Sequence, residues 1–167
     1  MSCLGVHFAL SGEEVETLRS QPDDSSRLDY LTEEIEENYF GNQPELVVES
    51  DKSWDAVHRT LTDGNLAWDN GKYPLNHVIL GGELLYRETD YIMSLKTPKQ
   101  VQDVAAATSS VTEVEFRQRY FAMDQKQYGS PLSEEDFNYT WENFLSVREF
   151  FLSAAKQNRY VLFTADQ

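Results

Sequence analysis

The stretch from Leu4 to Leu10 reads LGVHFAL, and the interpretation of the fold starts from it. Apart from His7 it is apolar on both faces, which is typical of a central strand covered on both sides. The next residues, Ser11–Glu14, read SGEE and have the pattern of a capping box, which predicts a helix that ends near Arg19. The chain is therefore expected to begin with a buried strand that leads directly into a helix.

Three more stretches predict strands. One is YVLFT at Tyr160–Thr164, near the other end of the chain, and one is DYIMSLK at Asp90–Lys96. Leu46–Val48 predicts a short strand, whereas Leu75–Leu80 is apolar without a clear period, so that a helix and a strand both remain open there. Because the first and the last predicted strand along the sequence both look buried, we expect the chain ends to lie near each other.

Cap residues and the helical spacing of apolar side chains predict helices between these strands. The predicted helices run from about Arg27 to Asn38, from Ser53 to Asp63, onward from Thr97, onward from Thr112, and from Ser133 to about Gln157. Strands and helices do not alternate regularly, which argues against a doubly wound sheet. The prediction is an α+β fold: a small mixed β-sheet with strands at both chain ends, covered by several helices.

Length and composition favour one domain, residues 1–167, because no repeat, low-complexity tract or linker divides the chain. Residues 1–10 lack the basic start of a signal peptide, and no uncharged apolar run approaches the roughly 18 residues that span a bilayer. Cys3 is the only cysteine, so no disulfide can form within the chain, which fits a reducing compartment. We expect a cytoplasmic protein that does not contact membranes.

The charge of the chain narrows its possible partners. Its 29 acidic and 14 basic residues give a net charge of −15. Such a charge repels the phosphates of nucleic acids and anionic lipids, so no nucleic-acid binding is predicted. The charge either keeps the protein in solution or speeds its encounter with a basic protein partner.

The most specific local pattern is WDAVH at Trp54–His58, inside a predicted helix. Helical spacing puts Trp54 and His58 one turn apart on one face, with Asp55 close enough to fix the tautomer of the imidazole or to raise its pKa. His58 would then be a general base or a ligand contact. The alternative is a half-buried histidine that packs behind Trp54 and makes one hydrogen bond.

Glycine and aromatic residues give the other candidates. Gly81-Gly82 is the only glycine pair, and its amides either surround an anion or form a tight turn. Trp68 lies in a predicted loop, where an exposed aromatic side chain with a carboxylate rim would suit a protein or a ligand, although ordinary packing is the alternative. A pocket that His58 shares with His77 or with a carboxylate such as Asp63 would favour an enzyme.

Motifs that carry chemistry are absent from the sequence. There is no phosphate-binding loop, no dinucleotide-binding glycine motif and no nucleophile elbow. The three histidines, His7, His58 and His77, lack the spacing of metal-binding motifs. We therefore predict no catalytic residue, no cofactor and no metal site. The predicted binding residues are Trp54, Asp55, His58, Trp68, His77, Gly81 and Gly82.

Two segments carry a resemblance to a known family: SWDAVHRTLTDG at Ser53–Gly64 and PLNHVILGG at Pro74–Gly82. With the N-terminal strand and its capped helix, they resemble the YfbM-like family of uncharacterised bacterial proteins. The resemblance implies a single α+β domain without an assigned activity, in which Trp54, His58 and the Gly81-Gly82 pair would line any common pocket. Because related small acidic domains occur in bacterial toxin–immunity systems, it also implies a possible immunity role.

Two functional hypotheses follow. The first is a non-enzymatic protein-binding domain that meets a basic partner through an acidic, aromatic-bearing surface, for example an immunity protein that blocks a toxin. The second is a small-ligand-binding protein or enzyme with a pocket around Trp54, His58 and the Gly81-Gly82 turn. A monomer and a homodimer both remain open.

Overall fold

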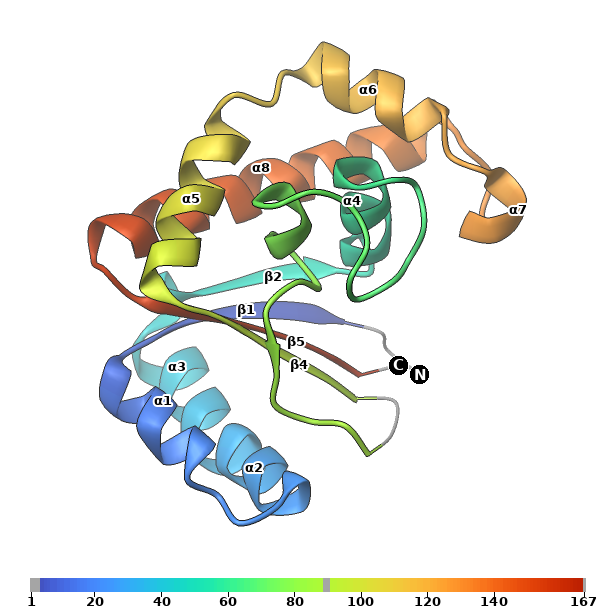
Figure 1. Ribbon diagram of the computed structural model, residues 1–167. Helices are drawn as coiled ribbons and strands as arrows, with labels where there is room; N and C mark the ends of the chain where they lie inside the picture. Colours follow the sequence, from blue (N-terminus) through green and yellow to red (C-terminus); the bar gives the residue numbers. More distant parts are fainter. Residues whose placement is uncertain (1–3, 89–90, 167) are drawn as a thin grey trace.

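The computed structural model describes residues 4–88 and 91–166, so that Cys3 and Asp90 lie outside the described residues. Its centre is a five-stranded sheet with the strand order β2-β1-β5-β4-β3 (Figure 1). The strands are β1 (Gly5–Leu10), β2 (Val47–Asp51), β3 (Glu83–Leu84), β4 (Tyr91–Lys96) and β5 (Tyr160–Asp166). The two strands predicted nearest the chain ends therefore lie side by side in the middle of the sheet.

The α+β prediction is confirmed, but the prediction of a mixed sheet is wrong. Every strand pair among the described residues is antiparallel. The cause lies in the connections: the helices after β1 return the chain to the end where β1 stops, so that β2 runs back along it with Phe8 opposite Val47. In β5, Ala165 pairs with Gly5 at the start of β1, so the two ends of the described chain lie together, as expected.

One face of the sheet is covered by the helices that follow β1 (Figure 1). They are α1 (Gly12–Arg19), α2 (Asp24–Tyr30), a π-helical segment η1 (Leu31–Glu36) and α3 (Glu37–Asn42). The predicted capping box is present: the hydroxyl of Ser11 accepts from the Glu14 amide at 3.2 Å, and the Glu14 carboxylate accepts from the Ser11 amide at 3.0 Å. The second helical stretch starts earlier than predicted because the carboxylate of Asp23 caps it.

The later helices lie on the opposite side of the sheet, with α6 and α7 farther out than α8 (Figure 1). They are α4 (Trp54–Leu61), α5 (Pro98–Ser109), α6 (Glu113–Phe121), α7 (Gln125–Tyr128) and α8 (Glu134–Lys156). Short 3-10 turns occur at η2 (Pro44–Leu46) and η3 (Leu75–His77), so the undecided stretch before Gly81 is neither a strand nor an α-helix. No helix among the described residues is both long and apolar enough to cross a membrane.

Alternation along the strands decides which side chains point to which helices. Phe8 contacts Tyr39 of α3, whereas its neighbour His7 contacts Phe150 and Phe151 of α8. Partners across the sheet share a face, so Phe163 and Ser94, in register with His7, point the same way. Both faces are buried, and the face toward α8 carries polar groups into the core.

Candidate functional site

A lysine lies at the centre of the buried polar groups. The side chain of Lys96, at the end of β4, is fully buried, and its Nζ donates to the carbonyl oxygen of Ile79. Ser94 accepts from the same amine through its carbonyl oxygen at 3.3 Å, and the ring centre of Phe163 is 5.5 Å away. Burial lowers the pKa of Lys96 well below its ordinary value, because the charged amine loses its water. Burial in the fold therefore disfavours the charged form of this lysine.

Two of the histidines have lowered pKa values as well. Burial, followed by the nearby Lys96, lowers the pKa of His7 to about 3, while its Nε2 lies 2.8 Å from the carbonyl oxygen of Val78. The same two causes lower the pKa of His77 to about 4. In the described part of the chain, no group of three or more His, Cys, Asp or Glu side chains is arranged to hold a metal ion. The side chains of His7 and Lys96 thus hold the backbone at Val78 and Ile79, in the segment that packs over β4.

His58 faces the long segment that follows α4. Its Nε2 lies 2.9 Å from the carbonyl oxygen of Ala67 and 2.7 Å from Oδ1 of Asn70. The expectation that Asp55 fixes this imidazole is wrong, because the Asp55 carboxylate pairs with Arg59 at 2.6 Å instead. Burial is the largest influence on His58, and the pKa of the ring is lowered.

Trp54 points in another direction. It is buried, and its ring centre lies 5.7 Å from that of Phe163 on the sheet. Its Cδ1 atom would lie only 2.7 Å from a Cβ atom at Gly5, which explains why a glycine fits at the start of β1. Trp54 and His58 therefore share a helix, but Trp54 packs against β1 and β5 while His58 secures a loop.

The Gly81-Gly82 pair forms a close crossing over β4. A Cβ atom at Gly81 would lie 2.4 Å from the carbonyl oxygen of Asn76, and one at Gly82 would lie 2.4 Å from that of Leu95. Gly82 also has a φ of +136°, which disfavours other residues. The amide of Gly81 donates to the Asn76 carbonyl at 2.9 Å, so its N–H is already used. These contacts match the turn interpretation and not an anion cradle.

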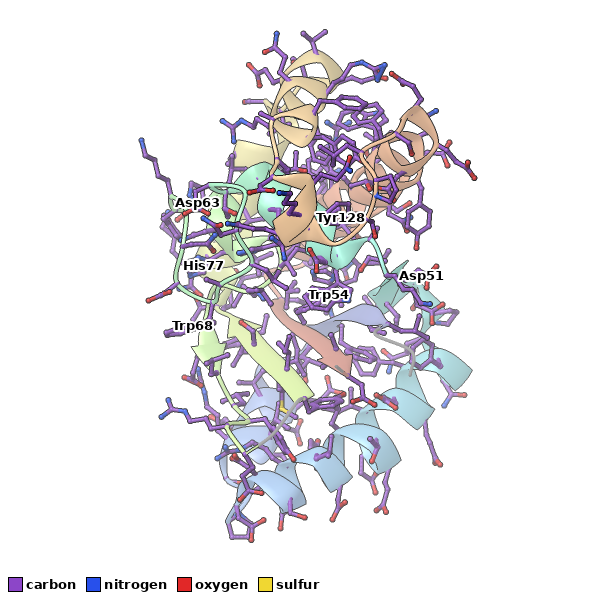
Figure 2. The ribbon with its side chains drawn as sticks, turned by 90° about the vertical axis from the view of Figure 1, so that its right-hand side faces the viewer. Asp51, Trp54, Asp63, Trp68, His77 and Tyr128 are labelled. Carbon is purple, nitrogen blue, oxygen red and sulfur yellow. The ribbon has the colours of Figure 1, made fainter. Side chains whose placement is uncertain are left out.

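The segment between α4 and β3 carries the only predicted site residue that is well exposed, Trp68, with 46% of its surface accessible. Figure 2 shows Asp63, Trp68 and His77 along this segment, apart from Trp54 next to the sheet. The side-chain amide of Asn70 donates to Thr62 Oγ1 at 3.2 Å and to the Asn65 carbonyl at 2.9 Å. His58 and Asn70 thus hold the backbone on both sides of Trp68.

A groove runs beside this tryptophan, and we call it the Trp68 groove. It has a volume of about 480 Å³, in the range of small-molecule sites. It is lined by Leu66, Ala67, Trp68, Leu80, Leu84, Tyr86, Arg87, Tyr91 and Ile92. The groove is thus mainly apolar and aromatic, with three aromatic side chains and a single charged one, Arg87.

A second groove, the acidic groove, opens on the other side of Tyr91. Its volume is about 380 Å³. It is lined by Leu4, Val6, Thr32, Glu36, Phe40, Glu49, Tyr91, Thr164, Ala165 and Asp166. Its lining has three carboxylates and no basic side chain, and Phe40 is 45% exposed. Burial raises the pKa of Glu36, because the charged carboxylate loses part of its water.

The structure therefore separates the predicted site residues into two groups. His58, Gly81 and Gly82 support the segment that carries Trp68, and His77 lies within that segment, whereas Trp54 and Asp55 point elsewhere. Sequence reasoning missed Lys96, Glu36 and Arg87. The alternation of Ser94 and Lys96 in DYIMSLK was the available signal for Lys96, since both residues point to the same face.

Comparison with known proteins identifies the family and supports the fold. The family described as "Domain of unknown function (DUF1877)" matches residues 1–164. The chain belongs to the DUF1877 family. A solved structure of similar fold is the protein of unknown function YfbM from Escherichia coli, with a TM-score of 0.65 and 18% sequence identity over 97% of this chain and 99% of that one. The YfbM-like resemblance is thus confirmed. No curated protein matches the sequence.

Proposed function

We propose that this DUF1877 protein is a non-enzymatic binding protein that takes up a basic segment of another protein in the acidic groove. The observation that carries the proposal is the lining of that groove, with Glu36, Glu49 and Asp166 and no cation. The net charge of −15 adds long-range attraction for a basic partner, which speeds association.

The apolar part of the groove supports the same kind of partner. Phe40 and Leu4 are exposed by 45% and 41% beside the carboxylates. An arginine or lysine side chain can pack its aliphatic stem against the Phe40 ring while its charged group, at the edge of that ring, pairs with Glu36 or Glu49. A basic segment with interspersed apolar residues is therefore the occupant that matches both features.

Within this proposal, a basic toxin is the first partner to examine. An immunity protein blocks its toxin before the toxin reaches a substrate, and an acidic groove is suited to cover a basic catalytic surface. We place this encounter in the cytoplasm, which fits the single cysteine of the sequence.

The test uses a fluorescent peptide that alternates arginine and leucine, with a second peptide in which glutamate replaces arginine. We expect the basic peptide to bind, and Glu36→Gln combined with Glu49→Gln to weaken binding by about tenfold or more. Glu142→Gln combined with Glu149→Gln is the matched control, since it makes the same charge change on α8.

Salt gives the second readout. Raising the ionic strength from about 0.02 M to about 0.5 M shortens the screening length from roughly 20 Å to roughly 4 Å and should weaken the complex. Binding that is insensitive to salt, or that the control pair weakens as much as the groove pair, would contradict the proposal.

A further inference from the structure

We infer that the Trp68 groove binds a planar aromatic molecule that carries a carboxylate. Trp68, Tyr86 and Tyr91 supply aromatic surface, and Arg87 is the one charged side chain in the lining. Flat ligands gain from stacking or edge contacts with such rings, and a guanidinium pairs with a carboxylate through two parallel hydrogen bonds. This site is independent of the proposed function, although Tyr91 borders both grooves.

The aromatic walls are held in place by the fold. Tyr86 and Tyr91 meet edge to face, with ring centres 5.7 Å apart. On the opposite side, His58 holds the carbonyl of Ala67, which directly precedes Trp68. The floor includes Leu80, which is buried next to the Gly81-Gly82 crossing. A ligand therefore meets a largely formed site and loses little binding free energy to ordering it.

The charge of Arg87 is available to a ligand. Its backbone amide donates to Oδ2 of Asp24 at 2.7 Å, but the other oxygen of that carboxylate pairs with Arg27 at 3.3 Å. Among the described residues, the guanidinium of Arg87 takes part in no ion pair within 4 Å. In a chain with a net charge of −15, an arginine that has no acidic partner within the described residues and lies beside three aromatic rings is well placed for an anion.

The same lining should bind other classes of ligand more weakly. An aromatic ammonium would place its charge next to Arg87, which is unfavourable. A neutral aromatic molecule would keep the ring contacts but lose the paired hydrogen bonds. The site should therefore rank three ligands that share one ring in the order carboxylate, alcohol, ammonium.

The experiment uses 2-naphthoate, 2-naphthylmethanol and 2-naphthylmethylammonium as probes, measured by calorimetry on the full chain. We expect 2-naphthoate to bind at least about tenfold more tightly than either of the others. Trp68→Leu and Arg87→Gln should each weaken its binding by about tenfold. Tyr73→Leu and Arg119→Gln are the matched controls, because both residues line a different pocket.

A second measurement, the NMR signals of the tryptophan indole N–H groups, shows where the probe binds, and the dispersion of the same spectra shows whether the variants fold. The chain has three tryptophans, and the indole N–H signal of Trp68, assigned with Trp68→Leu, should shift on addition of 2-naphthoate while those of Trp54 and Trp141 stay. Equal binding of the three probes, no saturable binding, or unchanged binding by Arg87→Gln would overturn the inference. Glu36→Gln with Glu49→Gln should leave naphthoate binding unchanged, which separates this result from the test of the acidic groove.

Discussion

The Nε2 atom of His58 on α4 lies 2.9 Å from the carbonyl oxygen of Ala67, the residue before Trp68. Since Oδ1 of Asn70 is also 2.7 Å away, both neighbours of Nε2 are acceptors, and the ring must carry its hydrogen on Nε2. The Nδ1 atom is buried and has no hydrogen-bond partner among the described residues. His58 is thus a fixed donor that ties a loop to a helix.

Replacing this donor should loosen the loop. His58→Leu removes the donor to the Ala67 carbonyl and to Oδ1 of Asn70, and we expect it to lower the free energy of unfolding by about 1–3 kcal/mol. Urea unfolding measures the loss, and iodide quenching of Trp68 fluorescence should increase. Ser146→Ala, on the exposed side of α8, is the control. If quenching is unchanged, His58 does not position Trp68.

The buried Lys96 should make stability rise with pH. Its pKa in the folded state lies well below the ordinary 10.5, so between these two values the unfolded chain binds more protons than the folded one. The free energy of unfolding therefore increases with pH across this window, by at most about 1.4 kcal/mol per pH unit, and the gain is lost as pH falls.

Lys96→Met should remove this dependence while it keeps the volume of the side chain. Urea unfolding at about pH 7, 8 and 9 is the measurement, and the slope of the variant should be flatter than that of the wild type. Lys99→Met, which changes a lysine side chain that is 78% exposed, is the control and should keep the wild-type slope. Parallel curves for Lys96→Met and wild type would show that the amine stays charged in the fold.

Acid should destabilise the protein through His7. Its pKa of about 3 in the fold lies below the ordinary 6.5, so its contribution to stability is complete above 6.5 and is lost as pH falls toward 3. Between about pH 6.5 and about pH 5 this amounts to about 2 kcal/mol. His7→Leu should reduce the loss between about pH 7 and about pH 5 by that amount in thermal or urea unfolding. An equally steep loss would refute the prediction.

Two of the glycines with positive φ, Gly82 and Gly129, give a matched pair because an added Cβ atom would be crowded at the first and free at the second. Gly82→Ala combines φ +136° with a contact of 2.4 Å to the Leu95 carbonyl, and we expect a loss of about 3 kcal/mol or complete misfolding. Gly129→Ala has φ +81° but open space, so it should lose only about 1 kcal/mol. Similar losses for the two variants, measured by thermal unfolding, would contradict the role of the crossing over β4.

Local patterns predicted the elements well where a single interaction defines them. The capping box predicted at Ser11 is present, because Ser11 and Glu14 satisfy each other's backbone amides, and a helix begins after Thr97 as expected. The strands at both ends were apparent from their apolar stretches. The start of α2 was missed because Asp23, and not a later residue, supplies the cap.

Relations between distant residues could not be predicted in this way. Strand direction depends on how the helical connections return the chain, which the apolar pattern of β1 does not contain. The partners of His58 lie in the loop at Ala67 and Asn70, whereas spacing on the helix pointed to Asp55. Lys96 was taken as the end of a strand, and its burial depends on the segment around Ile79 that folds over it.

The place of β5 has a consequence for synthesis on the ribosome. β5 lies between the pairs β2-β1 and β4-β3, which have no contact within the sheet except through it, and it is the last strand along the chain. While residues 160–166 are still inside the exit tunnel, the nascent protein can form only two separate half-sheets with open edges. The core is therefore completed only once β5 has left the tunnel, and until then the chain exposes the two strand edges that β5 later covers.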